Sequence, residues 1–266
     1  MHVFSFTVNV LIYTKMRRFT PVLLFSLFSA TMVHAQQPDV VDLGLPSGTL
    51  WGTCNVGATR PEEVGEYFAW GETEPKRKYD GKSYKYFKNT LIKPRGFNFG
   101  EKRDAWKEVT KYSVQSSTLQ QNQGYKGFLD NKTVLESLDD AAHMSLGSGW
   151  RTPTAQEFGE LVENCSQEWV LVDGVSCLKL TSKVPGYGDR YILLPTSGYK
   201  YDSKDSQWHW KESEHSVYLW SASLDTQRYS SNANYFHCDD VKQRLPDGMT
   251  HREIGMPVRP VFDPHN

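Results

Sequence analysis

Short apolar runs separated by turn residues extend over residues 41–262, and this alternation constrains the fold more than any other feature of the sequence. Apolar runs of about four to eight residues, bounded by glycine, proline, asparagine or aspartate, are typical of strands. We therefore predict an α+β fold in which strands predominate, with one or two helices. The strands are expected at 42–51 (two strands joined by a turn), 67–70, 169–172, 177–182, 191–195, 217–222, 233–237 and 257–262.

The clearest helix signal lies at residues 153–162. Thr152 or Thr154 is a suitable N-cap, because a hydroxyl oxygen can accept from a free backbone N–H of the first turn, and Pro153 is favoured near that turn. The apolar residues that follow recur at helical spacing, which gives the helix one apolar face.

Residues 76–130 differ from their surroundings, since they are rich in lysine, tyrosine, glutamine and asparagine and show weak periodicity. We predict that they form a long surface insertion. The full sequence has an ordinary globular composition, with 38% hydrophobic and 23% charged residues, and shows no internal repeat. Residues 36–266 are therefore expected to form a single domain.

The first 35 residues contain basic but no acidic side chains and predict an export signal. Two arginines follow Met16, an apolar stretch covers 19–32, and small residues precede a cleavage site between Ala35 and Gln36. The stretch is interrupted by polar residues and is shorter than the roughly 20 apolar residues of a spanning helix. We expect cleavage, no transmembrane segment afterwards, and a periplasmic, cell-surface or secreted protein. Residues 1–15 are explained by a true start at Met16, and the alternative is a longer signal peptide.

The four cysteines, Cys54, Cys165, Cys177 and Cys238, all follow the expected cleavage site. An even number in an exported chain favours at least one disulfide over free thiols. None of the spacings is C-x-x-C, which disfavours a zinc site or a redox dithiol. Three pairings are possible, and the residues alone do not choose between them.

Charge and motifs exclude several classes of function. The formal net charge of −1 lacks the basic footprint of a nucleic-acid-binding protein. No G-x-S-x-G or H-E-x-x-H motif is present, and His237 and Cys238 are neighbours on a predicted strand, which point to opposite faces. We therefore assign no catalytic residue, no metal ligand and no cofactor.

One group of acidic residues allows two interpretations. Asp139, Asp140 and His143 could share one side of a short turn and hold a hard cation through oxygen ligands. We favour the alternative that the two aspartates form the acidic first turn of a helix, where the helix dipole stabilises negative charge.

The candidate ligand-binding residues are Tyr199, Tyr201, Trp208 and Trp210. Aromatic rings on loops, next to charged side chains, are typical of sites that stack against sugars or dock a protein partner. The alternative is a hairpin in which Trp208 and Trp210 cover the core while His209 faces solvent.

Several short segments follow one another in a fixed order along the chain. They are VDLGL (41–45), WGTCNVGA (51–58), GEYFAWGETEP (65–75), LDDAAH (138–143), GWRTPT (149–154), LLP (193–195), SGY (197–199), LWSAS (219–223) and VRPV (258–261). Together they resemble the Fibrobacter succinogenes major paralogous domain family, and the resemblance covers about Val41 to Val261.

The resemblance implies an exported bacterial protein with a fold of the C-type lectin-like group, which includes the formylglycine-generating enzymes. It implies that the N- and C-terminal strands lie close together, and it favours a Cys54–Cys165 pair, with Cys177–Cys238 as a second bridge. A local Cys165–Cys177 bridge is the rival. Large aromatics dominate core packing, so we expect Trp150, Trp220 and Arg259 to be core residues.

The formylglycine-generating enzymes use a close cysteine pair near the end of the domain, and here only Cys238 lies in the last quarter. We therefore expect an exported, non-catalytic recognition module that binds a glycan or a surface protein. The alternative is an enzyme of unknown reaction related to the formylglycine-generating fold.

Overall fold

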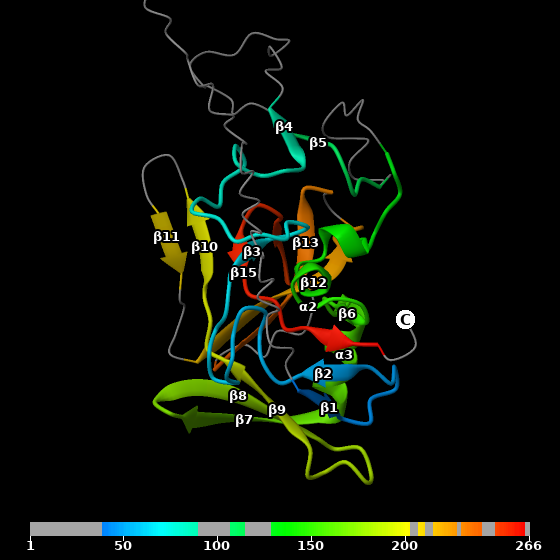
Figure 1. The fold of residues 1–266 in the computed structure, drawn as a ribbon, viewed down its shortest axis with the longest axis vertical. Coiled ribbons are helices and arrows are strands. Elements are labelled where there is room, and N and C mark those ends of the chain that lie inside the picture. Colours follow the sequence, from blue (N-terminus) through cyan, green and yellow to red (C-terminus); the bar gives the residue numbers. More distant parts are fainter. Residues whose placement is uncertain are drawn as a thin grey trace, which may run out of the picture. The chain divides into compact units, whose positions relative to one another are not determined.

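The computed structural model describes residues 39–89, 107–114, 129–202, 207–210, 215–227, 230–240 and 248–263. Only the backbone is described at 89, 107–108 and 207–210. Within these ranges the chain forms five β-sheets, two α-helices and one 3-10 turn (Figure 1). The predicted strand-rich α+β class is confirmed.

The described elements have the following bounds. They are β1 Val40–Asp42, β2 Leu50–Gly52, β3 Phe68–Ala69, β4 Phe87–Asn89, β5 Lys107–Val109, η1 Ser137–Asp139, α2 Ala141–Leu146, β6 Trp150–Arg151, α3 Ala155–Asn164, β7 Cys165–Val172, β8 Val175–Ser182, β9 Tyr191–Pro195, β10 Tyr199–Asp202, β11 Gln207–Trp210, β12 Ser216–Leu224, β13 Asn232–Asp239, β14 Gly248–His251, β15 Gly255–Met256 and β16 Val261–Phe262.

Both ends of the described chain enter one sheet, whose strand order is β1-β2-β16-β6. Trp51 of β2 lies opposite Val41 on one side and Val261 on the other, and Val261 lies opposite Arg151 of β6. All three pairings are antiparallel. The predicted closeness of the terminal strands is therefore observed, and it fixes β6 beside them.

The predicted helix is α3, which begins two residues later than expected because Thr154, and not Thr152, is its N-cap. The Thr154 hydroxyl accepts from the backbone N–H of Glu157, whose carboxylate accepts from the backbone N–H of Thr154 at 2.7 Å. This reciprocal capping box satisfies free N–H groups of the first turn. Phe158 and Leu161 on the inner face of the helix are fully buried.

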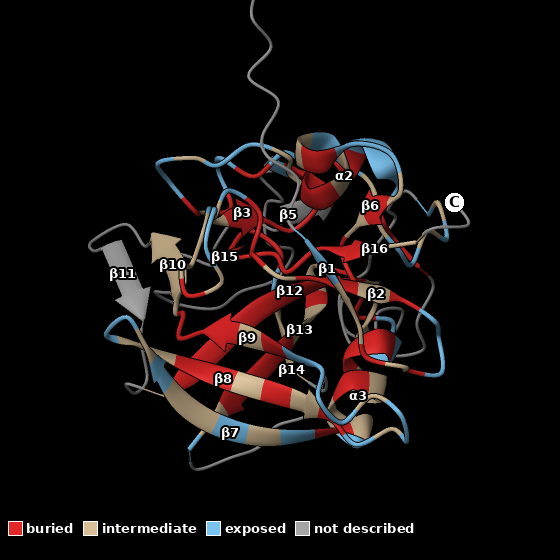
Figure 2. Cartoon of the chain, turned by 60° about the horizontal axis from the view of Figure 1, so that its bottom comes forward, coloured by how far each residue is buried: buried red, intermediate tan, exposed pale blue. Residues whose placement is uncertain are grey.

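The longest strands form two antiparallel sheets, β7-β8-β9 and β12-β13-β14. The β7–β8 hairpin turns at Asp173 and Gly174, which both have positive φ, as a tight two-residue hairpin turn requires. Figure 2 shows β12 buried along most of its length, whereas β7 has an exposed outer surface. Each strand predicted between 169 and 237 is present. β9 has the predicted bounds, and β7, β8, β12 and β13 are longer than predicted.

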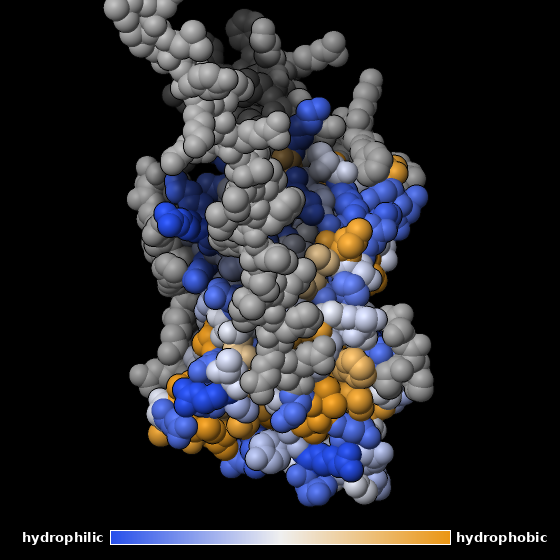
Figure 3. All heavy atoms as spheres, viewed as in Figure 1, coloured by the Kyte–Doolittle hydropathy of each residue, from blue (hydrophilic) through white to orange (hydrophobic). Residues whose placement is uncertain are grey.

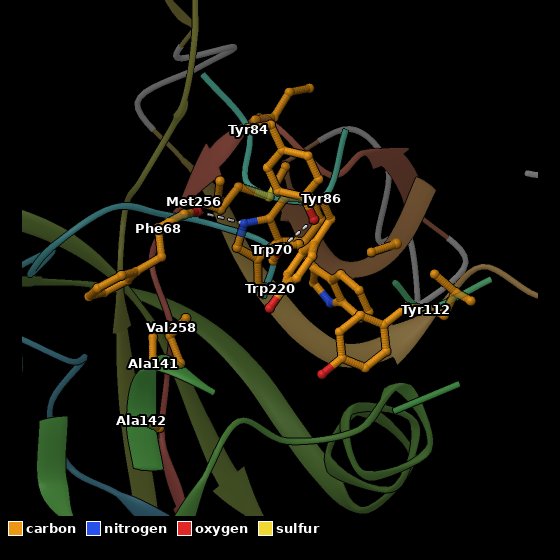
Figure 4. Packing of buried hydrophobic residues seen from close by; sticks show 14 of the residues in the cluster. Phe68, Trp70, Tyr84, Tyr86, Tyr112, Ala141, Ala142, Trp220, Met256 and Val258 are labelled. Atoms are coloured by element: carbon orange, nitrogen blue, oxygen red, sulfur yellow. Dashed lines mark hydrogen bonds between the residues drawn. The ribbon is translucent and has the colours of Figure 1, made fainter. Parts of the chain in front are cut away.

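Two hydrophobic clusters fill the interior. The first is aromatic and includes Trp70 and Trp220, whose indole N–H groups donate to the backbone carbonyls of Ser221 and Phe68 (Figure 4). The second lies between α3 and the long sheets and includes Trp51 and Phe158, whose rings are 5.4 Å apart. The clusters supply most of the burial that stabilises the fold.

The structure describes parts of the predicted surface insertion at 76–130, and these parts combine exposed lysines with buried tyrosines. Tyr79, Tyr84, Tyr86 and Tyr112 are buried in the first cluster. Tyr84, Tyr86 and Tyr112 lie around the guanidinium of Arg252. This guanidinium donates to the Tyr84 hydroxyl at 3.0 Å and lies 4.8 Å from the centre of the Trp70 ring. A buried cation amid aromatic faces explains why so many tyrosines are internal.

The three residues expected in the core are buried: Trp150 is 3% exposed, Trp220 1% and Arg259 0%. Arg259 donates to the backbone carbonyls of Gly52 and Leu193 and thereby ties the sheet of the chain ends to β9. Burial lowers the pKa of Arg259 to about 10.

All four cysteines are buried free thiols, so none of the predicted disulfides is present in the structure. The strand register explains why the rival bridge does not form. Cys165 lies opposite Ser182 and Cys177 opposite Val170, so the two cysteines are five residues apart along the hairpin. Five strand residues span about 17 Å, whereas a disulfide needs Cα atoms within about 7 Å. No helix among the described residues is long and apolar enough to cross a membrane.

Candidate functional site

A pocket of about 260 Å³ lies where α2, β6 and the start of α3 meet residues 134–137. We call it the α2–β6 pocket. Its lining combines serine and threonine hydroxyls, an imidazole, a guanidinium and a few apolar side chains. The lining residues are Val134, Leu135, Ser137, Asp140, His143, Ser148, Gly149, Trp150, Arg151, Thr152, Thr154 and Ala222.

Asp140 joins the elements that form the pocket. As the N-cap of α2, its carboxylate accepts from the backbone N–H of Ala142 at 2.9 Å. The same carboxylate accepts from the backbone N–H of Thr152 at 2.8 Å and from the Thr152 hydroxyl at 2.7 Å. Burial raises the pKa of Asp140, and these donors oppose the increase. The carboxylate therefore locks α2 to the chain that follows β6.

Arg151 and Glu157 form the second polar contact of this region. Guanidinium nitrogens of Arg151 lie 2.6 and 2.8 Å from the two carboxylate oxygens of Glu157, which is a bidentate geometry. Burial opposes the ionisation of Glu157, but donors from Arg151, Thr154 and Thr49 outweigh it and lower its pKa to about 2. Glu157 therefore stays ionised at neutral pH.

The remaining polar groups of the pocket are accessible. Ser137 and Ser148 are exposed, and His143 is half-buried. Their hydroxyl and imidazole groups can donate or accept hydrogen bonds, whereas Val134 and Leu135 supply apolar contact. A few convergent polar groups on a concave, partly apolar wall are typical of sites for small ligands.

The cation interpretation of Asp139, Asp140 and His143 finds no support in the geometry. Asp140 caps α2, and Asp139 contacts Lys111, Lys85 and the Tyr112 hydroxyl. Burial opposes the ionisation of Asp139, but these donors hold its pKa well below the ordinary value. Among the residues that the structure describes, no three metal-ligating side chains come together.

The predicted aromatic patch lies on the β10–β11 hairpin. Tyr199 lies opposite Trp210, and Tyr201 opposite Trp208, in an antiparallel register. Tyr199 and Tyr201 are half-buried and pack against the first cluster, and the Tyr199 ring is 5.3 Å from that of Tyr218. The side chains of Trp208 and Trp210 lie outside the described residues, so their role in binding stays a prediction.

No sequence pattern pointed directly to Ser137, Ser148 and Arg151 as site residues. Ser137 directly precedes the LDDAAH segment (138–143), Ser148 directly precedes the GWRTPT segment (149–154), and Arg151 lies within the latter. Both segments indicated only the family resemblance. Two such motif segments, 138–143 and 149–154, meet at the pocket. That two motif segments meet in space is the signal that could have identified the site.

Comparison with known protein families, curated proteins and solved structures finds no match to this chain.

Proposed function

We propose that this protein is an exported recognition module with a C-type lectin-like scaffold and that it binds a glycan in the α2–β6 pocket. The observation that carries the proposal is the pocket itself, because it is concave, lined by hydroxyl groups and fixed to the core by Asp140. At about 260 Å³ it lies just below the usual range for drug-sized ligands, which suits one sugar ring.

The scaffold and the export are supported separately. The resemblance of residues 41–261 to the Fibrobacter succinogenes major paralogous domain family suggests the lectin-like fold, and the pairing of β16 with β2 and β6 agrees with it. The basic and apolar N-terminal 35 residues support export.

Binding is favoured over catalysis by the state of the carboxylates around the pocket. Asp140 accepts three hydrogen bonds, and Glu157 forms an ion pair with Arg151. Both carboxylates therefore already have partners within the protein. An enzyme of the formylglycine-generating group would need a reactive thiol, and the described lining contains no cysteine.

A glycan array tests the proposal. The chain from residue 36 is labelled and compared with a Ser148→Trp variant, in which an exposed lining residue becomes large enough to fill the pocket. Ser166→Trp, at an exposed position on β7 away from the pocket, is the matched control. We expect one class of glycan to bind the parent and the control and to be lost in Ser148→Trp. A chain that binds no glycan, or a Ser148→Trp variant that binds like the parent, would contradict the proposal.

A further inference from the structure

β7 is an edge strand of the β7-β8-β9 sheet, and one side of its backbone is open. Directly before β7, the carbonyl of Asn164 accepts from the backbone N–H of Lys183 next to β8 at 2.8 Å, so the even-numbered residues of this strand face β8. The backbone groups of alternate strand residues face opposite sides. Those of Gln167, Trp169 and Leu171 therefore face away from β8.

These three outward backbone N–H groups have no hydrogen-bond partner in the part of the chain that the structure describes. The Leu171 side chain is 75% exposed, and Figure 2 shows β7 at the rim of the molecule. The opposite edge of the sheet differs, because the carbonyl of Leu193 in β9 already accepts from Arg259. β7 is therefore the edge of this sheet that can accept another strand.

β7 also lacks the features that usually protect an exposed edge. Proteins block such edges with prolines, lysines, bulges or very short strands. β7 has eight residues without proline or lysine, and its register with β8 has no irregularity. Glu168 is its one charged side chain. A regular, unprotected edge of this length is a template for pairing with a further strand.

We propose that this protein forms a two-fold symmetric dimer in which β7 pairs antiparallel with β7 of a second copy. Trp169 lies opposite Trp169 of the second copy, and Gln167 lies opposite Leu171 of that copy. In this register all the outward residues form hydrogen-bonded pairs, each of which exchanges two N–H···O bonds. The two sheets then become one continuous sheet. The proposal is independent of the proposed function.

The sequence of β7 is compatible with pairing to itself, which is why we assign the position to a second copy. Glu168 comes opposite Val170 of that copy, so no charged side chain lies directly opposite a like charge. Ser166 comes opposite Val172. An interface that uses the same surface on both copies closes as a two-fold dimer, the commonest form of oligomer.

Sedimentation equilibrium of the chain from residue 36 tests the dimer. We expect the mass to rise from that of one chain toward that of two between about 1 and 200 µM, because an interface of one strand pair is small. Leu171→Pro removes an outward N–H, which an edge strand tolerates, and should remain monomeric throughout. Leu171→Val keeps that N–H and should dimerise like the parent. A monomeric parent, or a Leu171→Pro variant that dimerises, would overturn the proposal.

Amide hydrogen exchange of the unmodified chain, followed by NMR at both concentrations, tests the surface even if the proline variant fails to fold. The amides of Gln167, Trp169 and Leu171 should exchange about tenfold more slowly at the high concentration. Those of Glu168 and Val170, which face β8, are the internal control and should be protected equally at both. A dimer in which the three outward amides exchange as fast as in the monomer uses another surface, and would refute pairing through β7.

Discussion

At the scale of single residues, a few buried polar side chains determine the geometry of the pocket. Asp140 connects α2 to Thr152, and Arg151 holds Glu157 beside the start of α3. An unpaired buried polar group costs free energy, so the loss of any of these contacts should destabilise the fold. The residues that shape the pocket are therefore also residues that stabilise it.

Replacing Asp140 with alanine should lower the free energy of unfolding by about 3 kcal/mol, because the N–H groups of Ala142 and Thr152 and the Thr152 hydroxyl lose their acceptor. Urea unfolding monitored by tryptophan fluorescence measures the change. Asp189→Ala, at an exposed position, should stay within about 0.5 kcal/mol of the parent. Equal effects of the two substitutions would show that Asp140 does not lock the pocket.

Glu157 should make stability depend on pH in the acidic range. Its pKa falls from an ordinary 4.5 to about 2 in the folded protein, so its stabilisation is complete above about pH 5 and is lost as the pH falls from 4.5 through 2. We expect Glu157→Gln to be less stable than the parent by about 2 kcal/mol at pH 6, allowing for the partial exposure of Arg151. Urea unfolding at pH 6, 4 and 2.5 should show this difference shrinking, and a constant difference would contradict the assignment.

At the scale of elements, local patterns predicted the helix and the long strands, whereas contacts between distant segments were not predictable. The capping residue Thr154 and the turn at Gly174 act within a few residues, so their signals lie in the local sequence. Tyr84 is buried because Arg252 reaches it from 168 residues away, and its lysine-rich surroundings resemble a surface loop. The pocket could not be predicted either, because it depends on contacts such as that between Asp140 and Thr152, which form only when the chain folds.

The β10–β11 hairpin can be separated from the pocket by one double variant. If glycan binds in the α2–β6 pocket, replacing Trp208 and Trp210 with alanine should leave array binding unchanged. Thermal unfolding of the same variant tests the predicted exposure of the two rings, because a core tryptophan cut to alanine costs about 3 to 5 kcal/mol. Loss of binding with an unchanged melting temperature would place the ligand on the hairpin.

At the scale of the whole molecule, the sheet of the chain ends holds the fold together and positions β6 at the pocket. On the face shown in Figure 3, the described surface mixes hydrophilic residues with small hydrophobic patches.

Counting reactive thiols tests whether the four cysteines are buried and free of disulfides, as in the structure. Burial raises the pKa of Cys165 and Cys238 to about 11, so both should react slowly in the folded protein. We expect a thiol reagent to detect four thiols after unfolding without reductant, and far fewer before unfolding. Detection of only two thiols, or of none, after unfolding would show that one or two disulfides form, as an exported protein favours.

Export should remove the segment that ends at Ala35. The intact mass of the protein recovered from outside the cytoplasm should correspond to a chain that begins at Gln36. A chain that retains the residues from Arg17 onward would contradict cleavage and favour an anchored protein.

The most direct test of the central claim is a crystal structure of the protein with the tightest-binding array glycan. We expect electron density for a sugar ring in the α2–β6 pocket, in contact with Ser137, His143 and Ser148. Density on the β10–β11 hairpin or on any other surface, with an empty pocket, would contradict the claim.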